Sequence, residues 1–213
     1  MVTYIFGITP FAEMVQSYIP TNEFGGYIVD KQYMPSLDRR DIIAWEDFDL
    51  NVSSNSCQII VAVGYNDMNF GRKKVFEKIK NAGFSVCNFV HPTAIISNNT
   101  EIGTGNIFLE NCVIQPFAKI GDCNIFWCNS TICHHSIIGN FNFFAASSVV
   151  LGKTIIGNQC FVGSNATIKN RLLVSDKTLI GAGAFLHTST EEGDVYVPVR
   201  SIKLDKKSED IKL

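Results

Sequence analysis

Residues 102–126 read IGTGNIFLENCVIQPFAKIGDCNIF, and every sixth residue of this stretch is a large apolar one. The same spacing continues without interruption in both directions. The apolar residues are Val90, Ile96, Ile102, Phe108, Ile114, Ile120, Phe126, Ile132, Ile138, Phe144, Val150, Ile156, Val162, Ile168, Val174, Ile180 and Leu186. A period of six fits neither the 3.6-residue turn of a helix nor the two-residue alternation of an ordinary strand. It is typical of a repeat architecture in which the chain coils.

A second column, two residues before the first, holds small or turn-forming residues that suit tight corners. Its members are Ala94, Thr100, Asn106, Cys112, Ala118, Asn124, Ser130, Ser136, Asn142, Ser148, Thr154, Cys160, Ala166, Thr178 and Ala184, with Leu172 as the exception. Gly103, Gly121, Gly139 and Gly157 recur every eighteen residues, so three hexapeptides should complete one coil. Each fully buried apolar side chain in the column would contribute roughly 1.5–3 kcal/mol. The pattern predicts a three-sided β-solenoid of short parallel strands.

The residues before the coils alternate between short apolar runs and amphipathic segments. This pattern predicts strands at 4–7, 27–30 and 59–64, helices at 11–18 and 69–81, and a return to the sheet at 84–86. In the second helix, Val75 and Ile79 should face inward, whereas Arg72 and the lysines should face water. Strands that alternate with helices predict a small parallel α/β unit. We expect this domain over 1–87, the solenoid over 88–187, and a cap and tail over 188–213.

Composition and charge restrict the class of partner. The chain has 213 residues, 46% of them hydrophobic, and a net charge of -2. The absence of a dense Lys/Arg cluster argues against nucleic acid or an anionic membrane as the main partner. No apolar run approaches the roughly 18 residues of a membrane span, and no signal-peptide pattern opens the chain. Together with seven cysteines and no C-x-x-C pair, this predicts a cytoplasmic protein that acts on a small molecule.

The first turn of the α/β unit lies where a dinucleotide-binding loop would lie. It keeps Gly7 and none of the later glycines of that fingerprint. The N–H groups at the start of the following helix could still bind a phosphate, and Asp30 could accept a hydrogen bond from a ribose hydroxyl. Two interpretations stay open. One is a nucleotide site, with NAD the less favoured nucleotide, and the other is a structural βαβ unit without a ligand.

The segment Ile132-Cys133-His134-His135-Ser136-Ile137-Ile138-Gly139 carries the residues best suited to chemistry. Since Ile132 and Ile138 take inward positions, His134 and His135 are expected on the outer surface. Histidine is the commonest general base near neutral pH. The alternative interpretation is a pair of solvated or interface histidines without catalytic work.

Several of these features together resemble the hexapeptide-repeat sugar acetyltransferases. The shared features are the N-terminal α/β unit, the entry His91-Pro92-Thr93-Ala94, the coils, the outward His-x-Ser before Ile-Gly, and the closing Val197-Pro198-Val199-Arg200. They are similar to the sialic-acid O-acetyltransferase and bacillosamine-pathway N-acetyltransferase family over nearly the whole chain. The resemblance implies that the solenoid is a left-handed parallel β-helix.

The resemblance also implies an activity and a base. The activity is transfer of an acyl group from acetyl-CoA, without a metal, to the amino group of a nucleotide-linked deoxyamino sugar, in surface-polysaccharide or glycan synthesis. His134 matches the family's general base, which deprotonates the amine as it attacks the thioester. This chain departs from the family pattern twice. His135 stands where Asp or Glu commonly orients the base, and Phe143 stands at a position that is often His.

The family binds CoA in a groove between neighbouring prisms of a homotrimer. Positions that line this groove match Gly152, Ser164 and Ala182, although small residues are also expected in any tightly wound coil. Arg200 or Lys203 could approach the CoA phosphates, and a solvated cap explains the same residues without a ligand. We therefore expect three sites at the interfaces of a homotrimer.

Four other functions remain as alternatives. A sugar O-acetyltransferase would use His134 in the same way. A thiolate acyl-enzyme would use Cys133. A zinc-dependent carbonic anhydrase would need three converging histidines, but His91 and His187 lie at the two ends of the solenoid. A non-catalytic trimeric scaffold would leave the histidine pair without a role.

Overall fold

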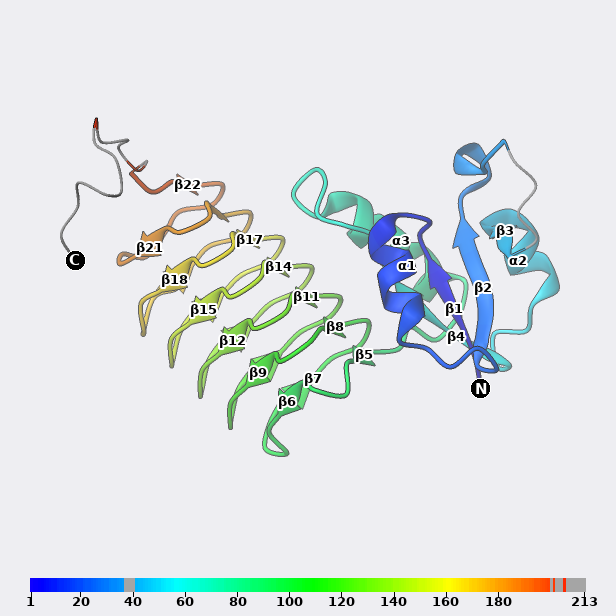
Figure 1. Cartoon of the computed structure of the whole chain (residues 1–213), viewed down its shortest axis with the longest axis horizontal. Helices are drawn as coiled ribbons and strands as arrows, with labels where there is room; N and C mark the ends of the chain where they lie inside the picture. The colour runs from blue at the N-terminus through cyan, green and yellow to red at the C-terminus, as the bar shows by residue number, and fades with distance from the viewer. Residues whose placement is uncertain (37–40, 200, 202–204, 206–213) are drawn as a thin grey trace.

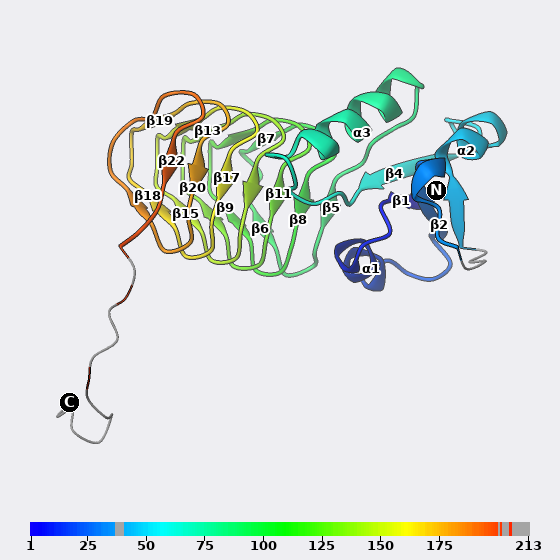
Figure 2. The ribbon, with the colours of Figure 1, turned by 90° about the horizontal axis from the view of Figure 1, so that it is seen from above.

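The computed structural model describes residues 1–36, 41–199, 201 and 205. It shows an N-terminal α/β region followed by a long solenoid (Figure 1). The α/β region lies beside the first coils of the solenoid, and the last coil, with β21 (Phe185–Leu186) and β22 (Val195–Tyr196), lies at the opposite end. Seen from above, helix α3 (Phe70–Asn81) extends from the α/β region towards the solenoid (Figure 2).

The described part of the α/β region forms a four-stranded parallel sheet with the order β3-β2-β1-β4. Its elements are β1 (Val2–Phe6), α1 (Pro10–Ser17), β2 (Phe24–Val29), the 3-10 turn η1 (Lys31–Tyr33), β3 (Ile42–Ala44), α2 (Trp45–Asn51), β4 (Cys57–Val61) and α3. The three expected strands and two expected helices are confirmed, with ends shifted by a few residues. The bridge between Ile59 and Val86 confirms the return to the sheet. Strand β3 and helix α2 were not predicted, because each is short and lacks a clear period.

The solenoid consists of two-residue strands, which form three parallel sheets in the described chain. The first sheet contains β5 (Phe89–Val90), β8 (Ile107–Phe108), β11 (Ile125–Phe126), β14 (Phe143–Phe144), β17 (Phe161–Val162), β20 (Leu179–Ile180) and β22 (Val195–Tyr196). The second contains β6 (Ile95–Ile96), β9 (Val113–Ile114), β12 (Thr131–Ile132), β15 (Val149–Val150), β18 (Thr167–Ile168) and β21 (Phe185–Leu186). The third contains β7 (Glu101–Ile102), β10 (Lys119–Ile120), β13 (Ile137–Ile138), β16 (Ile155–Ile156) and β19 (Leu173–Val174). Ile120 pairs with Ile138, which confirms the eighteen-residue coil.

The apolar column fills the interior of the prism, as its spacing predicts. From Phe108 to Leu186 every member of the column is buried. The rings of Phe108, Phe126 and Phe144 stack in parallel with centroids 4.8 and 4.9 Å apart. The first three members depart from the prediction, since Ile96 and Ile102 are only partly buried and Val90 is 47% exposed. They lie in the first coil, where no preceding coil covers them.

The corners explain the column of small residues. From the corner of Gly105 to that of Gly183, one residue at each corner takes the left-handed backbone conformation, with φ of 59° at His135 and 54° at Cys123. The buried side-chain oxygen Oδ1 of Asn124 accepts a hydrogen bond at 2.8 Å from the backbone N–H of Asn142, the equivalent residue in the next coil. Nδ2 of Asn124 donates to the Gly139 carbonyl at 2.9 Å. Small polar side chains therefore satisfy corner backbone groups that the short strands leave unpaired.

The α/β region covers the outer face of the first sheet. Ile107 and Ile125, which point outward from the solenoid, share a buried cluster with Ile5 of β1 and Ala12 of α1. The two regions are thus joined by a common apolar core. The proposed boundary at 87 and 88 lies between the Val86 bridge and β5.

Arg72 of α3 corrects one prediction. It was expected in water, yet it is fully buried between α3 and the solenoid. Its guanidinium donates at 2.9–3.1 Å to the backbone carbonyls of Cys123, Gly64, Phe141 and Asn142 and to the side chain of Asn69. Burial lowers its pKa to about 10, so it stays charged at neutral pH. The helix period could not reveal this role, because the acceptors lie on distant corners of the solenoid.

The end of the chain adds one more strand to the first sheet. Strand β22 pairs in parallel with β20 inside the segment 188–213 that was expected to form the cap and tail. Val197 and Val199 are exposed. Arg200 and Lys203 lie outside the described residues.

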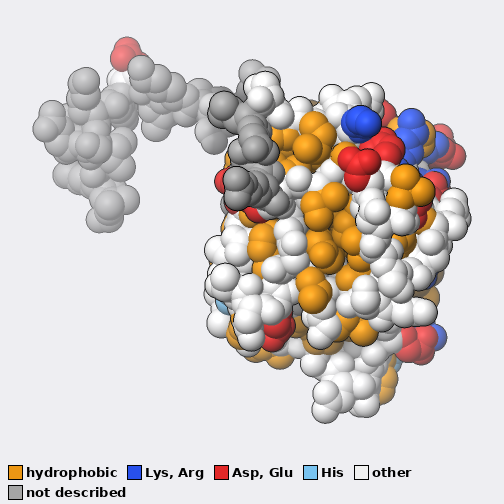
Figure 3. All heavy atoms as spheres, turned by 90° about the vertical axis from the view of Figure 1, so that its right-hand side faces the viewer, with side chains coloured by type: hydrophobic (Ala, Val, Ile, Leu, Met, Phe, Trp, Pro, Cys, Tyr) orange, Lys and Arg blue, Asp and Glu red, His pale blue; other side chains and the backbone are white. Residues whose placement is uncertain are grey.

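The surface charge and the length of the helices can be compared with the prediction that neither nucleic acid nor a membrane is the main partner. The face in Figure 3 shows mostly hydrophobic and uncharged side chains, with Lys and Arg beside Asp and Glu near its edge. Among the described residues, no helix combines the length and the apolar character needed to cross a membrane.

Candidate active site

His134 lies on the outer surface at the corner between β12 and β13, as predicted. Its backbone N–H donates to Oε1 of Gln115 in the preceding coil at 3.0 Å. Its ring packs against Gly152 in the next coil, where an added Cβ would lie 2.8 Å from both Cε1 and Nε2. The structure therefore brings together two of the predicted site residues. Because Gly152 has no side chain, the imidazole of His134 can occupy this space.

His135 is the immediate partner of His134. The two Nδ1 atoms are 3.1 Å apart, and the rings meet edge to face with centroids 5.2 Å apart. The contact is a hydrogen bond when one of the two Nδ1 atoms carries a hydrogen. If His134 donates, its Nε2 keeps a lone pair that can accept a proton from a substrate. His135 also packs on Phe117 of the preceding coil, with ring centroids 4.9 Å apart, so its orientation is supported from a second side.

Cys133 is a poor candidate for a nucleophile. It is half-buried, and burial raises the pKa of its thiol. A thiolate, which is the reactive form, is therefore disfavoured at this position. This argues against the acyl-enzyme alternative.

The residues considered for a metal site are spread over the solenoid. Cys123, Cys128 and Cys133, which are evenly spaced by five residues in the sequence, lie at three different corners of the prism. His91 packs edge to face against Tyr18 at the first coil, and His187 packs beside Phe185 at the last. Within the residues that the structure describes, no three His, Cys, Asp or Glu side chains come together as a metal site.

Ser164 and Ala182 lie on another edge of the prism, at the corners between the first and second sheets. The backbone N–H of Gly183 donates to the Ser164 carbonyl at 2.8 Å, so the two corners stack on each other. The predicted CoA residues therefore form two groups in one chain. Gly152 lies with His134, and Ser164 lies with Ala182.

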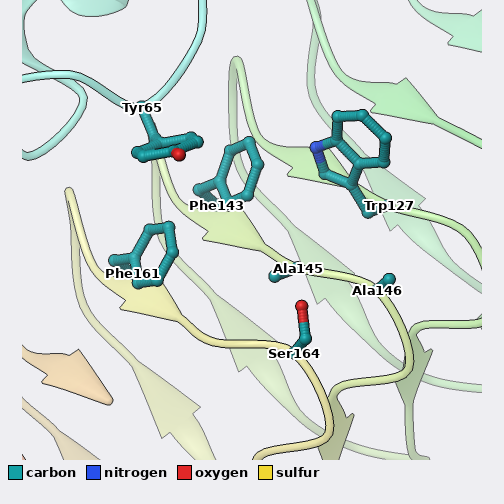
Figure 4. A pocket seen from close by; sticks show the side chains of 7 residues that line it. All are labelled: Tyr65, Trp127, Phe143, Ala145, Ala146, Phe161 and Ser164. Atoms are coloured by element: carbon teal, nitrogen blue, oxygen red, sulfur yellow. The ribbon is translucent and has the colours of Figure 1, made fainter. Parts of the chain in front are cut away.

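A cavity of about 340 Å³ opens beside this second edge, between the α/β region and the first sheet. Figure 4 shows the residues that line it, which are Tyr65, Trp127, Phe143, Ala145, Ala146, Phe161 and Ser164. The Tyr65 ring contacts the rings of Phe143 and Phe161, with centroids 4.8 and 5.1 Å apart. The indole Nε1 of Trp127 is buried and has no hydrogen-bond partner among the described residues. We name this cavity the aromatic pocket.

Sequence reasoning missed the aromatic pocket. Phe143 and Phe161 occupy the outward position of their strands, where the other two sheets of the solenoid mostly carry polar or smaller residues. This was the available signal. Tyr65 comes from the loop after β4, and nothing in its local sequence indicates that it contacts the solenoid.

Gly7 and Asp30 lie at the carboxyl ends of β1 and β2. The strand order reverses direction between β1 and β4, and ligands of parallel sheets bind at such a switch point. Thr9 caps α1 there by accepting from the Ala12 N–H. Gly7 and Asp30 each make a contact that affects the predicted role in nucleotide binding. A Cβ on Gly7, whose φ is 132°, would lie 2.6 Å from the carbonyl oxygen of Ala62. The fold therefore requires a glycine at this position even without a ligand.

The Asp30 carboxylate is already engaged. It forms an ion pair with Lys78 of α3, whose ammonium also lies over the rings of Phe6 and Trp45 at 5.2 and 5.6 Å. A ribose hydroxyl would therefore share Asp30 with Lys78. The role of Asp30 in nucleotide binding stays a prediction.

Comparison with known proteins gives one repeat model and several solved structures. The family model described as bacterial transferase hexapeptide (six repeats) matches residues 135–170. No curated protein sequence matches the chain at a significant level. The acetyltransferase domain of PglB from Neisseria gonorrhoeae FA1090, solved with acetyl coenzyme A, is 22% identical, with a TM-score of 0.78 over 91% of this chain and 94% of that one.

Two further structures are similar to the same extent. PerB from Caulobacter crescentus, solved with CoA and GDP-perosamine, is 19% identical, with a TM-score of 0.81 over 92% of this chain and 93% of that one. WeeI from Acinetobacter baumannii AYE is 19% identical, with a TM-score of 0.80 over 91% of this chain and 95% of that one. The predicted fold is thereby confirmed: the chain is an α/β region followed by a left-handed parallel β-helix of hexapeptide repeats.

Proposed function

We propose that this protein is an acetyl-CoA-dependent N-acyltransferase that acts on a nucleotide-linked amino sugar. The observation that carries the proposal is the arrangement of His134, whose exposed ring is held between Gly152 and the Nδ1 atom of His135. The proposal is supported by the shared fold, since structures with this fold were solved with acetyl-CoA, or with CoA and GDP-perosamine.

His134 would act as the general base. As the sugar amine forms its new bond to the thioester carbonyl carbon, Nε2 of His134 takes the proton that the nitrogen loses. The carbon–sulfur bond then breaks, and the same proton can pass to the departing sulfur of CoA. His135 would accept the hydrogen bond from Nδ1 of His134 and hold the ring in the required tautomer. General-base assistance of this kind typically contributes about 10²–10⁴ in rate.

We propose a homotrimer, because one chain does not assemble the whole site. The corner of His134 and Gly152 and the corner of Ser164 and Ala182 are different edges of the prism. A neighbouring copy would place the first corner against the second, with acetyl-CoA in the groove between them.

The outer face of the third sheet supports this assembly. Ile137, Ile155 and Leu173 point outward in three successive coils next to the His134 corner, and they are 43%, 44% and 52% exposed. Such a column of exposed apolar side chains is suited to burial against a second copy.

The nucleotide of the sugar substrate would bind at the crevice near Gly7 and Asp30, where helix α1 begins. All seven cysteines lie in the described part of the chain and are free. Free cysteines support the further proposal of a cytoplasmic enzyme of surface-polysaccharide or glycan synthesis.

The test is a thiol-release assay with acetyl-CoA and a panel of UDP-, dTDP- and GDP-linked amino sugars. We expect release with at least one amino sugar, and a loss of turnover of at least about a hundredfold for His134→Ala. His187→Ala, which removes an exposed histidine from the last coil, is the matched control and should keep wild-type turnover. Wild-type kinetics of His134→Ala would remove this residue from the mechanism.

The same panel separates the alternative functions. Matched nucleotide sugars that carry only hydroxyl groups are added to the panel, and thiol release with them would assign O-acetylation instead. If no sugar reacts, and acetyl-CoA does not protect the protein against thermal unfolding, the scaffold interpretation holds, because a ligand that binds the folded state raises its apparent stability.

A further inference from the structure

We propose that the aromatic pocket is the subsite for the sugar ring of the substrate. This inference rests on the proposed function and deepens it by assigning the residues that hold the sugar. The sequence pattern of the solenoid assigns no role to Tyr65, Trp127 or Phe161, whereas Ser164 at the rim of the pocket is shared with the proposed CoA groove.

The first argument is the shape and chemistry of the walls. The rings of Phe143 and Phe161 lie parallel, with centroids 5.4 Å apart, on adjacent strands, and Tyr65 closes over both (Figure 4). Ala145 and Ala146 line the cavity where larger side chains would fill it. An apolar cavity with a few polar groups is the usual form of a small-molecule site. The C–H face of a deoxy sugar is both flat and apolar, and it fits such walls.

The second argument is the unpartnered nitrogen of Trp127. A buried indole N–H without an acceptor is costly and is normally paired. Trp127 lines the pocket together with Ser164 and Tyr65, two residues that carry hydroxyl groups. A sugar supplies ring and hydroxyl oxygens that can accept from the indole. The small number of donors suits a sugar with few hydroxyl groups.

The third argument is position. Tyr65 follows β4, and Phe11 at the start of α1 stacks on Trp127 with ring centroids 5.6 Å apart. The segment after β4 therefore lines the pocket, and the segment after β1 packs against one of its walls. A nucleotide sugar whose diphosphate lies at the switch point would extend its sugar over the solenoid. Ser164 lies there, at the edge where the proposed trimer brings the partner's histidine corner.

The base of the nucleotide is a less suitable occupant. The reacting amine belongs to the sugar, and it must lie next to the solenoid, where the acyl donor is expected. The base would then point away from the solenoid, into the α/β region. The acyl chain and the CoA arm are the other possible occupants, and the experiment distinguishes them.

The experiment measures binding of three ligands by calorimetry. They are the nucleotide sugar that the wild-type protein turns over, the same nucleoside diphosphate without the sugar, and acetyl-CoA. For Phe161→Ala and Tyr65→Ala we expect the nucleotide sugar to bind about tenfold more weakly, as for loss of a stacking contact. Binding of the other two ligands should change less than about twofold.

Phe185→Ala is the matched control, because it removes an exposed phenylalanine from another sheet of the solenoid. It should leave all three affinities unchanged. Equal loss of the nucleoside diphosphate would assign the pocket to the base, and loss of acetyl-CoA alone would assign it to the acyl donor. Either result overturns the inference while the proposed function stands. A wild-type protein that binds none of the nucleotide sugars would overturn both.

A second measurement does not depend on removing a wall of the pocket. The chain has two tryptophans, and the other, Trp45, is buried in the α/β region. In Trp45→Phe, the fluorescence of Trp127 should respond to the nucleotide sugar and not to the nucleoside diphosphate or acetyl-CoA. Trp127→Phe should weaken binding of the nucleotide sugar by about two- to tenfold, since one hydrogen bond is lost. An unresponsive Trp127 would contradict the inference.

Discussion

The solenoid and the α/β region differ in how far the sequence near a residue determines its surroundings. In the solenoid, Ile120, Ile138 and Ile156 hold the same register position in successive coils, and all three are buried. In the α/β region, Arg72 holds a helix position that its neighbours assign to water, and it is buried as well. A coil contacts mainly the coils next to it, so its contacts repeat with the sequence. The contacts of α3 come from partners far away in the chain.

The largest expected effect tests the contact that joins the two regions. Arg72→Met should lower the free energy of unfolding by at least about 3 kcal/mol, because several buried carbonyls lose their donor at about 1–3 kcal/mol each. Arg72→Lys should recover part of the loss, since Lys has three donors where Arg has five. Denaturant unfolding at a fixed protein concentration measures both.

Lys80→Met is the control for this prediction, because Lys80 lies on the exposed side of the same helix. It should change stability by less than about 0.5 kcal/mol. If Arg72→Met were as stable as this control, the guanidinium would not be a structural link between the regions.

The same contrast explains how much was predictable. The column of apolar residues, the eighteen-residue coil and the outward position of His134 follow from a period that one sequence displays. Strand β3, helix α2 and the buried state of Arg72 depend on tertiary contacts without a period.

The candidate site divides in the same way. His134 and Gly152 are eighteen residues apart, so the repeat places one above the other. The Nδ1 contact of His135 depends on ring orientations that a period cannot give. The aromatic pocket depends on Tyr65 and Trp127, which meet only where the two regions are joined.

The second prediction compares two isoleucines of the same sheet. Ile156 has paired coils on both sides, and the side chain is buried, so Ile156→Ala should cost about 2–5 kcal/mol. Ile102 lies on β7, the first strand of that sheet, and is only partly buried. Ile102→Ala should cost no more than about half as much, since less apolar area leaves the interior. Equal losses in denaturant unfolding would show that stacking on both sides does not set the stability of a coil.

The third prediction concerns the histidine pair and is about activity, not stability. His135→Phe keeps a ring on Phe117 but removes the acceptor for Nδ1 of His134. We expect kcat to fall about tenfold with KM unchanged, a fraction of the full general-base contribution of about 10²–10⁴. His135→Asp should restore most of the rate, because Asp supplies an acceptor and tolerates the left-handed backbone of this corner. If His135→Phe and His135→Asp had equal rates, the hydrogen bond would not position the base.

The smallest expected effects come from two glycines, one in each region. Gly152→Ala places a methyl group 2.8 Å from the His134 ring, so the ring must turn away from its position beside His135. We expect turnover to fall a few-fold. The free energy of unfolding should fall by about 1 kcal/mol, because the methyl group also lies 3.1 Å from the backbone carbonyl oxygen of His134. Gly71→Ala meets no atom within 4 Å in α3 and should raise stability by about 0.5–1 kcal/mol, as helical glycines cost roughly that much relative to alanine. Kinetics and denaturant unfolding of both variants separate the two cases. A Gly152→Ala protein with full turnover would show that the ring position of His134 in the free protein is not the one used in catalysis. The repeat that places His134 over Gly152 would then determine the fold but not the geometry of the reaction.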